Sequence, residues 1–330
     1  MKRCCTTTDE NAVAKSDKLQ FVERFAIEAA RQTEVRRASC RRYNLRGHFQ
    51  NKKNMKLVQL ITFLVALSAI SLAQTKSFNR TVDFTPGGDL RVNTDVGTVK
   101  ITSWDRNQVE VIARIEGRNN ERVSADYMRR AVEATEIEMI GSGNNLTVKA
   151  NYENVPYESK WGGKNRVIPR IEWEIRAPRR ANIDLDTDRS EADVRGFEGR
   201  HSLKTDRTPL RVEDMAGDIR LDIDRGNTTR LSSIRGSLQI EADRTDLTFE
   251  RLQLTGDSRV QMDRGKLEMR MAGSQGLNVS MNKERRSSFQ SDFPMTTNSF
   301  SDDKLEGAIN GGGPRLTLHT DRTQVYLKNN

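Results

Sequence analysis

An Asp-Arg dipeptide that recurs at nearly regular intervals is the feature of this 330-residue sequence with the clearest chemical potential. The aspartates of five consecutive pairs lie 18, 18, 19 and 20 residues apart, and a sixth pair follows after a longer interval. The pairs are Asp188-Arg189, Asp206-Arg207, Asp224-Arg225, Asp243-Arg244, Asp263-Arg264 and Asp321-Arg322. Carboxylates repeated in this way could bind calcium or a charged polysaccharide, and two of them could form the acid pair of a polysaccharide lyase or hydrolase.

The arginine beside each aspartate favours a structural role for the repeated carboxylates. If the repeats stack in register, the first five aspartates form a column with a spacing of about 4.8 Å, in which bare carboxylates would repel one another. Each arginine would offset this repulsion by bridging the carboxylates of its own and the neighbouring repeat. We therefore predict a structural ion network. The alternative is that the column, or the face formed by Asp184, Asp186 and Asp222, binds calcium or a charged polysaccharide. Calcium is disfavoured because it requires about six to eight oxygens with few cations nearby. An acid pair is disfavoured because these acids recur as scaffold residues do.

Metal and nucleophilic catalysis have few candidate residues in this chain. All three cysteines (Cys4, Cys5 and Cys40) precede Met55, and only two histidines, His201 and His319, follow it. Neither a His-x-x-x-His nor a Gly-x-Ser-x-Gly motif occurs. We expect both histidines to be surface strand residues, and we expect no metal and no cofactor.

A polar loop at residues 151–170 is a second candidate binding surface, because it carries Tyr152, Tyr157 and Trp161. Tyrosine and tryptophan dominate the contact energy of many interfaces. The interpretation that we favour is a loop folded over the side of the protein with its aromatic side chains tucked in.

The elements that position these residues follow from the repeat itself. Apolar residues alternate with polar ones before each Asp, as in Ile219, Leu221 and Ile223, and the alternation resumes after it, as in Leu247 and Phe249. A two-residue period is typical of a strand with one buried face. Small residues stand two places after each Asp, where glycine would relieve a positive φ. Units of this length bury their apolar faces by stacking. We therefore predict an all-β fold, a parallel β-solenoid (single-stranded β-helix) of 18–20-residue coils over residues 181–330.

Residues 78–180 are predicted to form an N-terminal β region with one short helix and the polar loop. A segment around Asp95 fits the repeat, with Val96 in place of the arginine. The apolar spacing after Ser124, which is placed to cap a helix, predicts the helix at residues 124–134.

The segment from Met55 has the layout of a secretory signal peptide. A short basic start is followed by sixteen largely apolar residues, Leu57 to Leu72, and a small-x-small cleavage site that ends at Ala73. Sixteen residues is short for a membrane span, which needs about 20. We expect residues 55–73 to be a cleaved signal peptide, with retention as an anchor as the alternative. We then expect residues 1–54 to be a mis-called N-terminal extension, disordered or a short helix.

Most of the net positive charge lies in the segment that we expect to be absent from the exported protein. The whole chain carries +9, but residues 1–54 hold 13 Lys and Arg against 6 Asp and Glu. With Lys56 this segment accounts for eight of the nine charges, which leaves about +1 for residues 74–330. A near-neutral exported chain is not expected to bind nucleic acid.

Several stretches together resemble a bacterial family of exported β-strand-repeat proteins, usually labelled "putative adhesins" of unknown function. The resemblance covers residues 78–328 and rests on Gly88-Asp89-Leu90-Arg91-Val92, Gly97-Thr98-Val99-Lys100-Ile101, Trp104-Asp105, Ile175-Arg176-Ala177-Pro178, Ser291-Asp292-Phe293-Pro294 and the run from Gly307 to Gly313. Family members typically have glycine-rich turns where this chain has Asp-Arg. The resemblance implies an exported solenoid related to single-stranded β-helices, with no activity established.

We therefore expect a non-catalytic exported protein, adhesin-like or a cell-envelope scaffold, that binds an unidentified protein or glycan at the cell surface. The alternative is a carbohydrate-active enzyme, a polysaccharide lyase or hydrolase on a β-helix. After cleavage near Ala73 the protein would be periplasmic, exposed on the outer surface or secreted. It would contact the membrane only if the apolar segment were retained.

Overall fold

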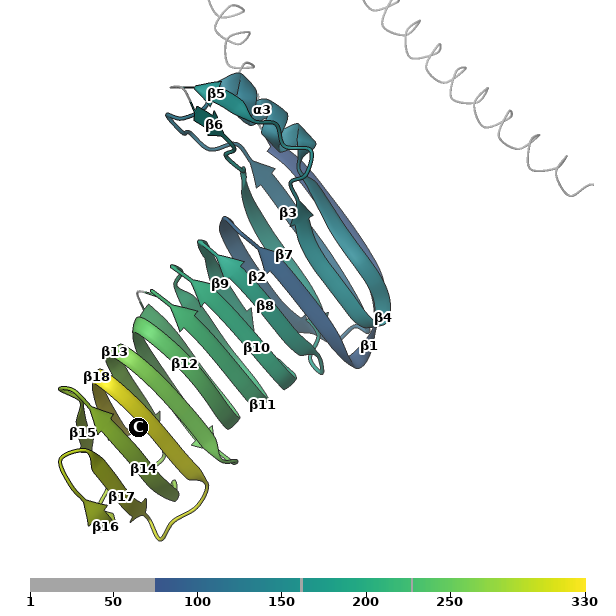
Figure 1. Cartoon of the computed structure of the whole chain (residues 1–330). Coiled ribbons are helices and arrows are strands. Elements are labelled where there is room, and N and C mark those ends of the chain that lie inside the picture. The colour runs from purple at the N-terminus through teal and green to yellow at the C-terminus, as the bar shows by residue number, and fades with distance from the viewer. Residues whose placement is uncertain (1–74, 161–162, 227) are drawn as a thin grey trace, which may run out of the picture. The chain divides into compact units, whose positions relative to one another are not determined.

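The computed structural model describes residues 75–160, 163–226 and 228–330 (Figure 1). The predicted extension 1–54, the predicted signal peptide 55–73 and Trp161 lie outside the described residues. Within the described residues the chain is all-β with one short helix, α3 (Ala125–Ala134), as the sequence predicted. The division of the β region at residue 180 stays a prediction.

The strands lie in a nearly uninterrupted succession along the described chain. The first seven are β1 (Thr75–Thr94), β2 (Gly97–Trp104), β3 (Gln108–Glu116), β4 (Glu136–Asn151), β5 (Glu158–Lys160), β6 (Gly163–Asn165) and β7 (Arg170–Pro178). The strands that hold the Asp-Arg repeats are β8 (Asn182–Asp188), β9 (Ser190–Arg195), β10 (Glu198–Asp206), β11 (Leu210–Asp224), β12 (Thr228–Leu254), β13 (Ser258–Met271) and β18 (Arg315–Asn329). Between the last two come β14 (Leu277–Glu284), β15 (Ser288–Ser291), β16 (Met295–Phe300) and β17 (Lys304–Ile309).

The predicted fold class, a parallel β-solenoid, is wrong, because the main sheet closes on itself as a mixed eight-stranded β-barrel. The closed path runs β10-β8-β1-β3-β7-β2-β9-β11 and returns to β10. Closure is possible because β11 pairs with β9 through residues 210–213 and with β10 through residues 216–224. The barrel is mixed because β3 runs antiparallel to both β1 and β7. Alternating apolar residues in β3 predict its burial correctly, but alternation does not specify the direction of pairing.

The Asp-Arg repeats are joined by parallel pairing in register. Asp188 pairs with Asp206, Asp206 with Asp224, Asp224 with Asp243 and Asp243 with Asp263. Strand β18 then pairs with β13 so that Asp321 lies opposite Asp263. Figure 1 shows β11, β12, β13 and β18 side by side in this order. The register therefore places one aspartate on each successive strand.

The core consists of the alternate positions that the sequence pattern predicted to be apolar. Ile219, Leu221 and Ile223 before one Asp-Arg turn are at most 2% exposed, and Leu247 and Phe249 after another are fully buried. Burying such side chains stabilises a fold by about 1.5–3 kcal/mol each. The outward positions between them remain free to form a polar surface on the strands.

A second, smaller apolar cluster joins α3 to the polar loop at residues 151–170. Ser124 caps the helix, because its hydroxyl accepts a hydrogen bond from the Tyr127 N–H. The Tyr127 hydroxyl is buried against Val155 and Val167, where it donates to the Pro156 carbonyl and accepts from the Val167 N–H. These bonds fix the loop on the helix.

Among the described residues, no helix is both long enough and apolar enough to cross a membrane.

Candidate functional site

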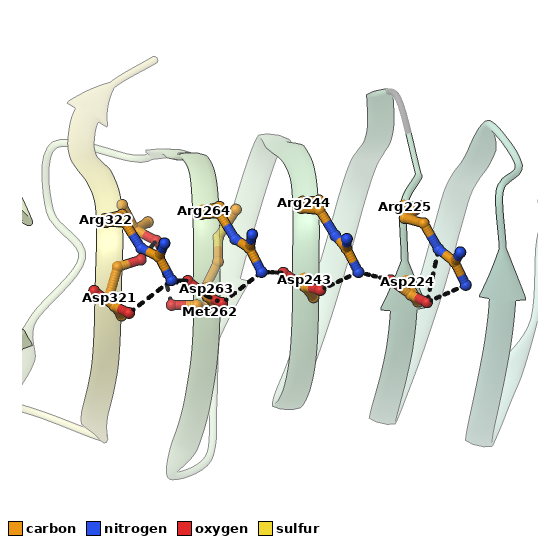
Figure 2. A network of polar contacts seen from close by, with 10 residues as sticks. Asp224, Arg225, Asp243, Arg244, Met262, Asp263, Arg264, Asp321 and Arg322 are labelled. Atoms are coloured by element: carbon orange, nitrogen blue, oxygen red, sulfur yellow. Dashed lines mark hydrogen bonds and ion pairs between the residues drawn. The ribbon is translucent and has the colours of Figure 1, made fainter.

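The Asp-Arg column, defined as the six pairs from Asp188-Arg189 to Asp321-Arg322, is a continuous chain of ion pairs. Each guanidinium lies 2.7–3.1 Å from the carboxylate of its own pair. From the second pair onward, each also lies 3.0–3.4 Å from the carboxylate of the preceding pair. Figure 2 shows this alternation from Asp224 to Arg322. The column thus has the bridging geometry expected of a structural ion network, and ligand binding along it stays a prediction.

The electrostatics of the column are those of a partly exposed network. The arginine side chains are 39–54% exposed and the aspartates 20–39%. Hydrogen bonding to Asp224, helped by the charges of Asp224 and Asp206, raises the pKa of Arg225 above its ordinary value. Single exposed pairs contribute about 0–1 kcal/mol, and networks contribute more. The carboxylates of the column are occupied by the protein's own cations.

The backbone of each turn differs from the expectation. The arginines themselves take a positive φ, at 49–60°. Of the residues two places after the Asp, where a positive φ was expected, Gly265 also has one, at 154°. That later residue is small because it points inward: Ser190, Thr208 and Thr323 are at most 1% exposed. The Thr208 hydroxyl donates to the Asp206 carbonyl at 2.7 Å, and Thr323 repeats this bond to Asp321. The turn therefore places the threonine inside and the arginine outside.

The column ends at Asp95, where Val96 replaces the arginine. Strand pairing places Thr94 opposite Thr187 and Gly97 opposite Ser190, so Asp95 follows Asp188 in the column. Burial raises the pKa of Asp95, and the nearby charge of Asp188 adds to the effect. Because Asp95 has no arginine beside it in the sequence, its negative charge is less well balanced than those of the six aspartates in the Asp-Arg pairs.

The two described aromatic residues of the polar loop, Tyr152 and Tyr157, do not share one surface. Tyr152 packs against both apolar clusters, and burial together with the neighbouring Asp95 raises the pKa of its hydroxyl. Tyr157 is 63% exposed, and the Arg166 guanidinium lies 5.4 Å from its ring centre. Trp161 lies outside the described residues. The favoured interpretation of a tucked-in loop therefore fits Tyr152 but not Tyr157.

A groove that we call the outer groove crosses the solvent face of the strands preceding the Asp-Arg turns. Its volume is about 1070 Å³, and strands from β4 and β1 to β18 contribute to it. Its polar lining comprises Asp89, Arg91, Asn145, Thr147, Asn182, Asp184, Arg200, His201, Ser202, Asp218, Arg220, Ser237, Gln239, Asp257, Ser258, Arg259, Arg315 and Thr317. Most of these residues occupy the outward positions four and six places before the Asp. Sequence reasoning named Asp184 on this face as a possible ligand contact but did not identify the groove, because the row six places before the Asp was not aligned.

The carboxylates of the outer groove are held by the protein. Asp184 forms an ion pair with Arg91 at 2.8 Å, and Asp218 accepts a hydrogen bond from Ser237 at 2.6 Å. Asp89 accepts from the Asn182 amide at 2.8 Å. Each of these partners lies on the adjacent strand, so the strands fix the acids in place.

His201 is buried, so the expectation that it lies at the surface is wrong. It occupies the inward position that Ile183 and Ile219 take in the flanking repeats, and it is 2% exposed. Its Nδ1 accepts a hydrogen bond from the Ile183 N–H, and burial lowers its pKa to about 4. His319 is partly exposed and shares a hydrogen bond with Asn282. In the described part of the chain, no group of three or more His, Cys, Asp or Glu is placed to hold a metal ion.

Comparison with known proteins gives only distant likenesses. No family model matches the chain, and no curated protein matches it. A "putative cell adhesion protein" of Clostridium sporogenes has 10% identity and a TM-score of 0.28, over 77% of this chain and all of that one. A "putative lipid binding protein" of Parabacteroides distasonis has 9% identity and a TM-score of 0.27, over 76% of this chain and 96% of that one. A "putative adhesin" of Bacteroides fragilis has 12% identity and a TM-score of 0.25, over 77% and 97%. Likenesses this weak carry no argument about function, and the β-helix type implied by the adhesin resemblance is unsupported.

Proposed function

We propose that this chain is a non-catalytic, exported binding module of the cell envelope, and that the outer groove is where it binds a glycan. The observation that supports this proposal is the groove itself, an extended polar surface built from equivalent positions of successive repeats. Side chains with hydrogen-bond donors and acceptors, such as Ser202 and Gln239, suit a ligand rich in hydroxyl groups.

The same geometry favours binding over catalysis. Glycoside hydrolysis requires a carboxylic acid held protonated near a second carboxylate. In the groove, Asp184 is held in an ion pair with the Arg91 guanidinium at 2.8 Å. Asp95, whose pKa is raised by burial, is not among the residues that line the groove.

A bulky residue in the groove tests the proposal. Gln239 is exposed in the middle of the groove, and Arg211 is exposed in the part of β11 that pairs with β9, outside it. We expect the purified protein to bind on a glycan array without degrading the bound polysaccharide. Gln239→Trp should weaken binding at least about tenfold, whereas the matched control Arg211→Trp should leave it unchanged.

The opposite results are equally clear. Equal loss in both variants would remove the groove from the proposal. Release of reducing ends from a polysaccharide would favour the carbohydrate-active enzyme instead.

A further inference from the structure

The outer groove consists of two parallel rows of outward side chains, one residue per strand. The upper row follows the register Asp89, Asn182, Arg200, Asp218, Ser237, Asp257 and Arg315. The lower row, two residues later in each strand, is Arg91, Asp184, Ser202, Arg220, Gln239, Arg259 and Thr317. A ligand along the groove would therefore meet a new pair of side chains about every 4.8 Å.

The two rows differ in charge. From Ser202 to Thr317 the lower row contains two arginines and no carboxylate. The upper row contains three aspartates and two arginines. Its carboxylates accept hydrogen bonds at 2.6–2.8 Å, Asp257 from the Arg315 N–H. The lower row thus presents guanidinium groups to a ligand. The upper row presents carboxylates that are held in place, with guanidinium groups between them.

Three groove arginines lack an ionic partner among the described residues. Arg91 is paired with Asp184, and Arg220 lies 3.4 Å from Glu241. Arg200, Arg259 and Arg315 are exposed, and none of these guanidiniums forms an ion pair within 4.0 Å of a carboxylate in the described residues. Unpaired guanidiniums favour a ligand with planar oxyanions, because the two groups form bidentate hydrogen bonds.

We infer that the ligand of the outer groove is a linear acidic glycan whose sugar carboxylates contact Arg200, Arg259 and Arg315. This inference rests on the proposed function and names the ligand class of the same groove. Arg200 on β10 and Arg259 on β13 are three strand spacings apart, or about 14 Å, which a single sugar does not span. Hydroxyl groups between these carboxylates then meet the upper-row acceptors, Asp218 and Asp257.

The groove is poorly suited to an acidic peptide. A peptide that binds as an added strand needs a sheet edge with free backbone groups. The groove crosses the face of strands that already pair on both sides, such as β10, β11 and β13. The apolar residues that line it are at most 2% exposed, so they form no pockets for apolar side chains.

The test compares probes that differ only in charge or in backbone. The purified protein is titrated by calorimetry at low salt with sodium polygalacturonate, with its methyl ester and with poly-L-glutamate. We expect polygalacturonate to bind about tenfold or more tightly than the uncharged ester, and a galacturonate tetramer to bind more tightly than a dimer. Arg200→Gln with Arg259→Gln should weaken polygalacturonate binding by at least about tenfold, whereas the exposed control Arg211→Gln should not change it.

Three contrary results distinguish the acidic character of the ligand, its glycan nature and the proposed function. Equal affinity for the acid and its ester, which requires no variant to fold, overturns the acidic ligand but leaves a glycan-binding groove. Poly-L-glutamate that binds as tightly as polygalacturonate and is lost in the double variant overturns the glycan in favour of an acidic peptide. Binding of no sugar polymer, acidic or neutral, overturns both this inference and the proposed function.

Discussion

Arginine takes a backbone conformation at each Asp-Arg turn that glycine normally takes. A non-glycine residue with φ near 55° costs about 1 kcal/mol, and here six arginines accept it. The gain is that, from Arg207 onward, each guanidinium lies between two carboxylates, as Arg244 does between Asp224 and Asp243. Strain in the backbone and attraction in the side chains therefore act against each other at the same residue.

Two substitutions at Arg244 separate these effects. Both Arg244→Gly and Arg244→Ala remove the ion pairs with Asp224 and Asp243, but only the glycine variant relieves the positive φ of 53°. We expect the glycine variant to be more stable than the alanine variant by about 1 kcal/mol. Urea unfolding measures the difference, and equal stabilities would show that this turn carries no strain.

A buried histidine makes stability depend on pH. Because burial lowers the pKa of His201 to about 4 in the fold, against about 6.5 when unfolded, the neutral form is the one that the fold accommodates. Its contribution is therefore complete above pH 6.5 and is lost as the pH falls towards 4. Between pH 7.5 and pH 5 the loss is about 2 kcal/mol.

The variant His201→Ile removes this dependence without opening a cavity, because isoleucine occupies the equivalent position at Ile183 and Ile219. We expect its free energy of unfolding to fall by about 2 kcal/mol less than that of the natural protein over the same pH interval. Parallel pH profiles for the two proteins would contradict the assignment.

At the scale of elements, stacked glycines form the second corner of the repeats. A Cβ on Gly217 would lie 2.0 Å from the Gly199 carbonyl oxygen, and one on Gly236 would lie 1.7 Å from the Gly217 oxygen. Both residues also have positive φ. Successive strands therefore approach here more closely than any side chain allows.

Gly217→Ala should destabilise the protein by about 3 kcal/mol or more, because backbone atoms on the neighbouring strand would have to move. The control is Gly311→Ala, where φ is also positive but no atom lies within 4 Å of the added Cβ. There the cost should be about 1 kcal/mol. Thermal unfolding of the two variants tests the contact, which a similar loss in both would exclude.

Sequence periodicity could predict these elements because it records burial directly. It predicted strands on both sides of each Asp-Arg turn, the helix after Ser124 and the in-register aspartates. It could not predict the barrel, because the direction of β3 depends on its neighbours and not on its own alternation. It also could not predict the buried His201, since a polar residue at an inward position looks like a break in the pattern. The alternation placed Asp184 on an outward face, but it could not show that this face is hollowed into a groove, because the pattern of burial does not specify the curvature of the strands.

At the scale of the whole described unit, stability should vary between the closed barrel and the open end of the sheet. Strand β11 has neighbours on both sides, whereas β16 is the last strand of the sheet and pairs only with β17. Five of the six residues of β16 are exposed. Elements with few buried contacts open locally, well below the free energy of global unfolding.

Amide hydrogen exchange should therefore be fast in β16 and slowest in β8, β10 and β11. The slow amides should exchange only through global unfolding, so their protection should fall with urea as the global stability does. If β16 were as protected as β11, another segment or molecule would have to cover that edge.

Strand β18 pairs directly with β13 in the sheet, although four strands, β14 to β17, lie between them in the sequence. The join preserves both the Asp263–Arg322 contact and the two rows of the outer groove. This part of the sheet is therefore modular, because a duplicated unit of about 19 residues would add one more strand in the same register. Evolution could lengthen the groove by about 4.8 Å per duplication, and so match it to ligands of different length, without redesigning the rest of the molecule.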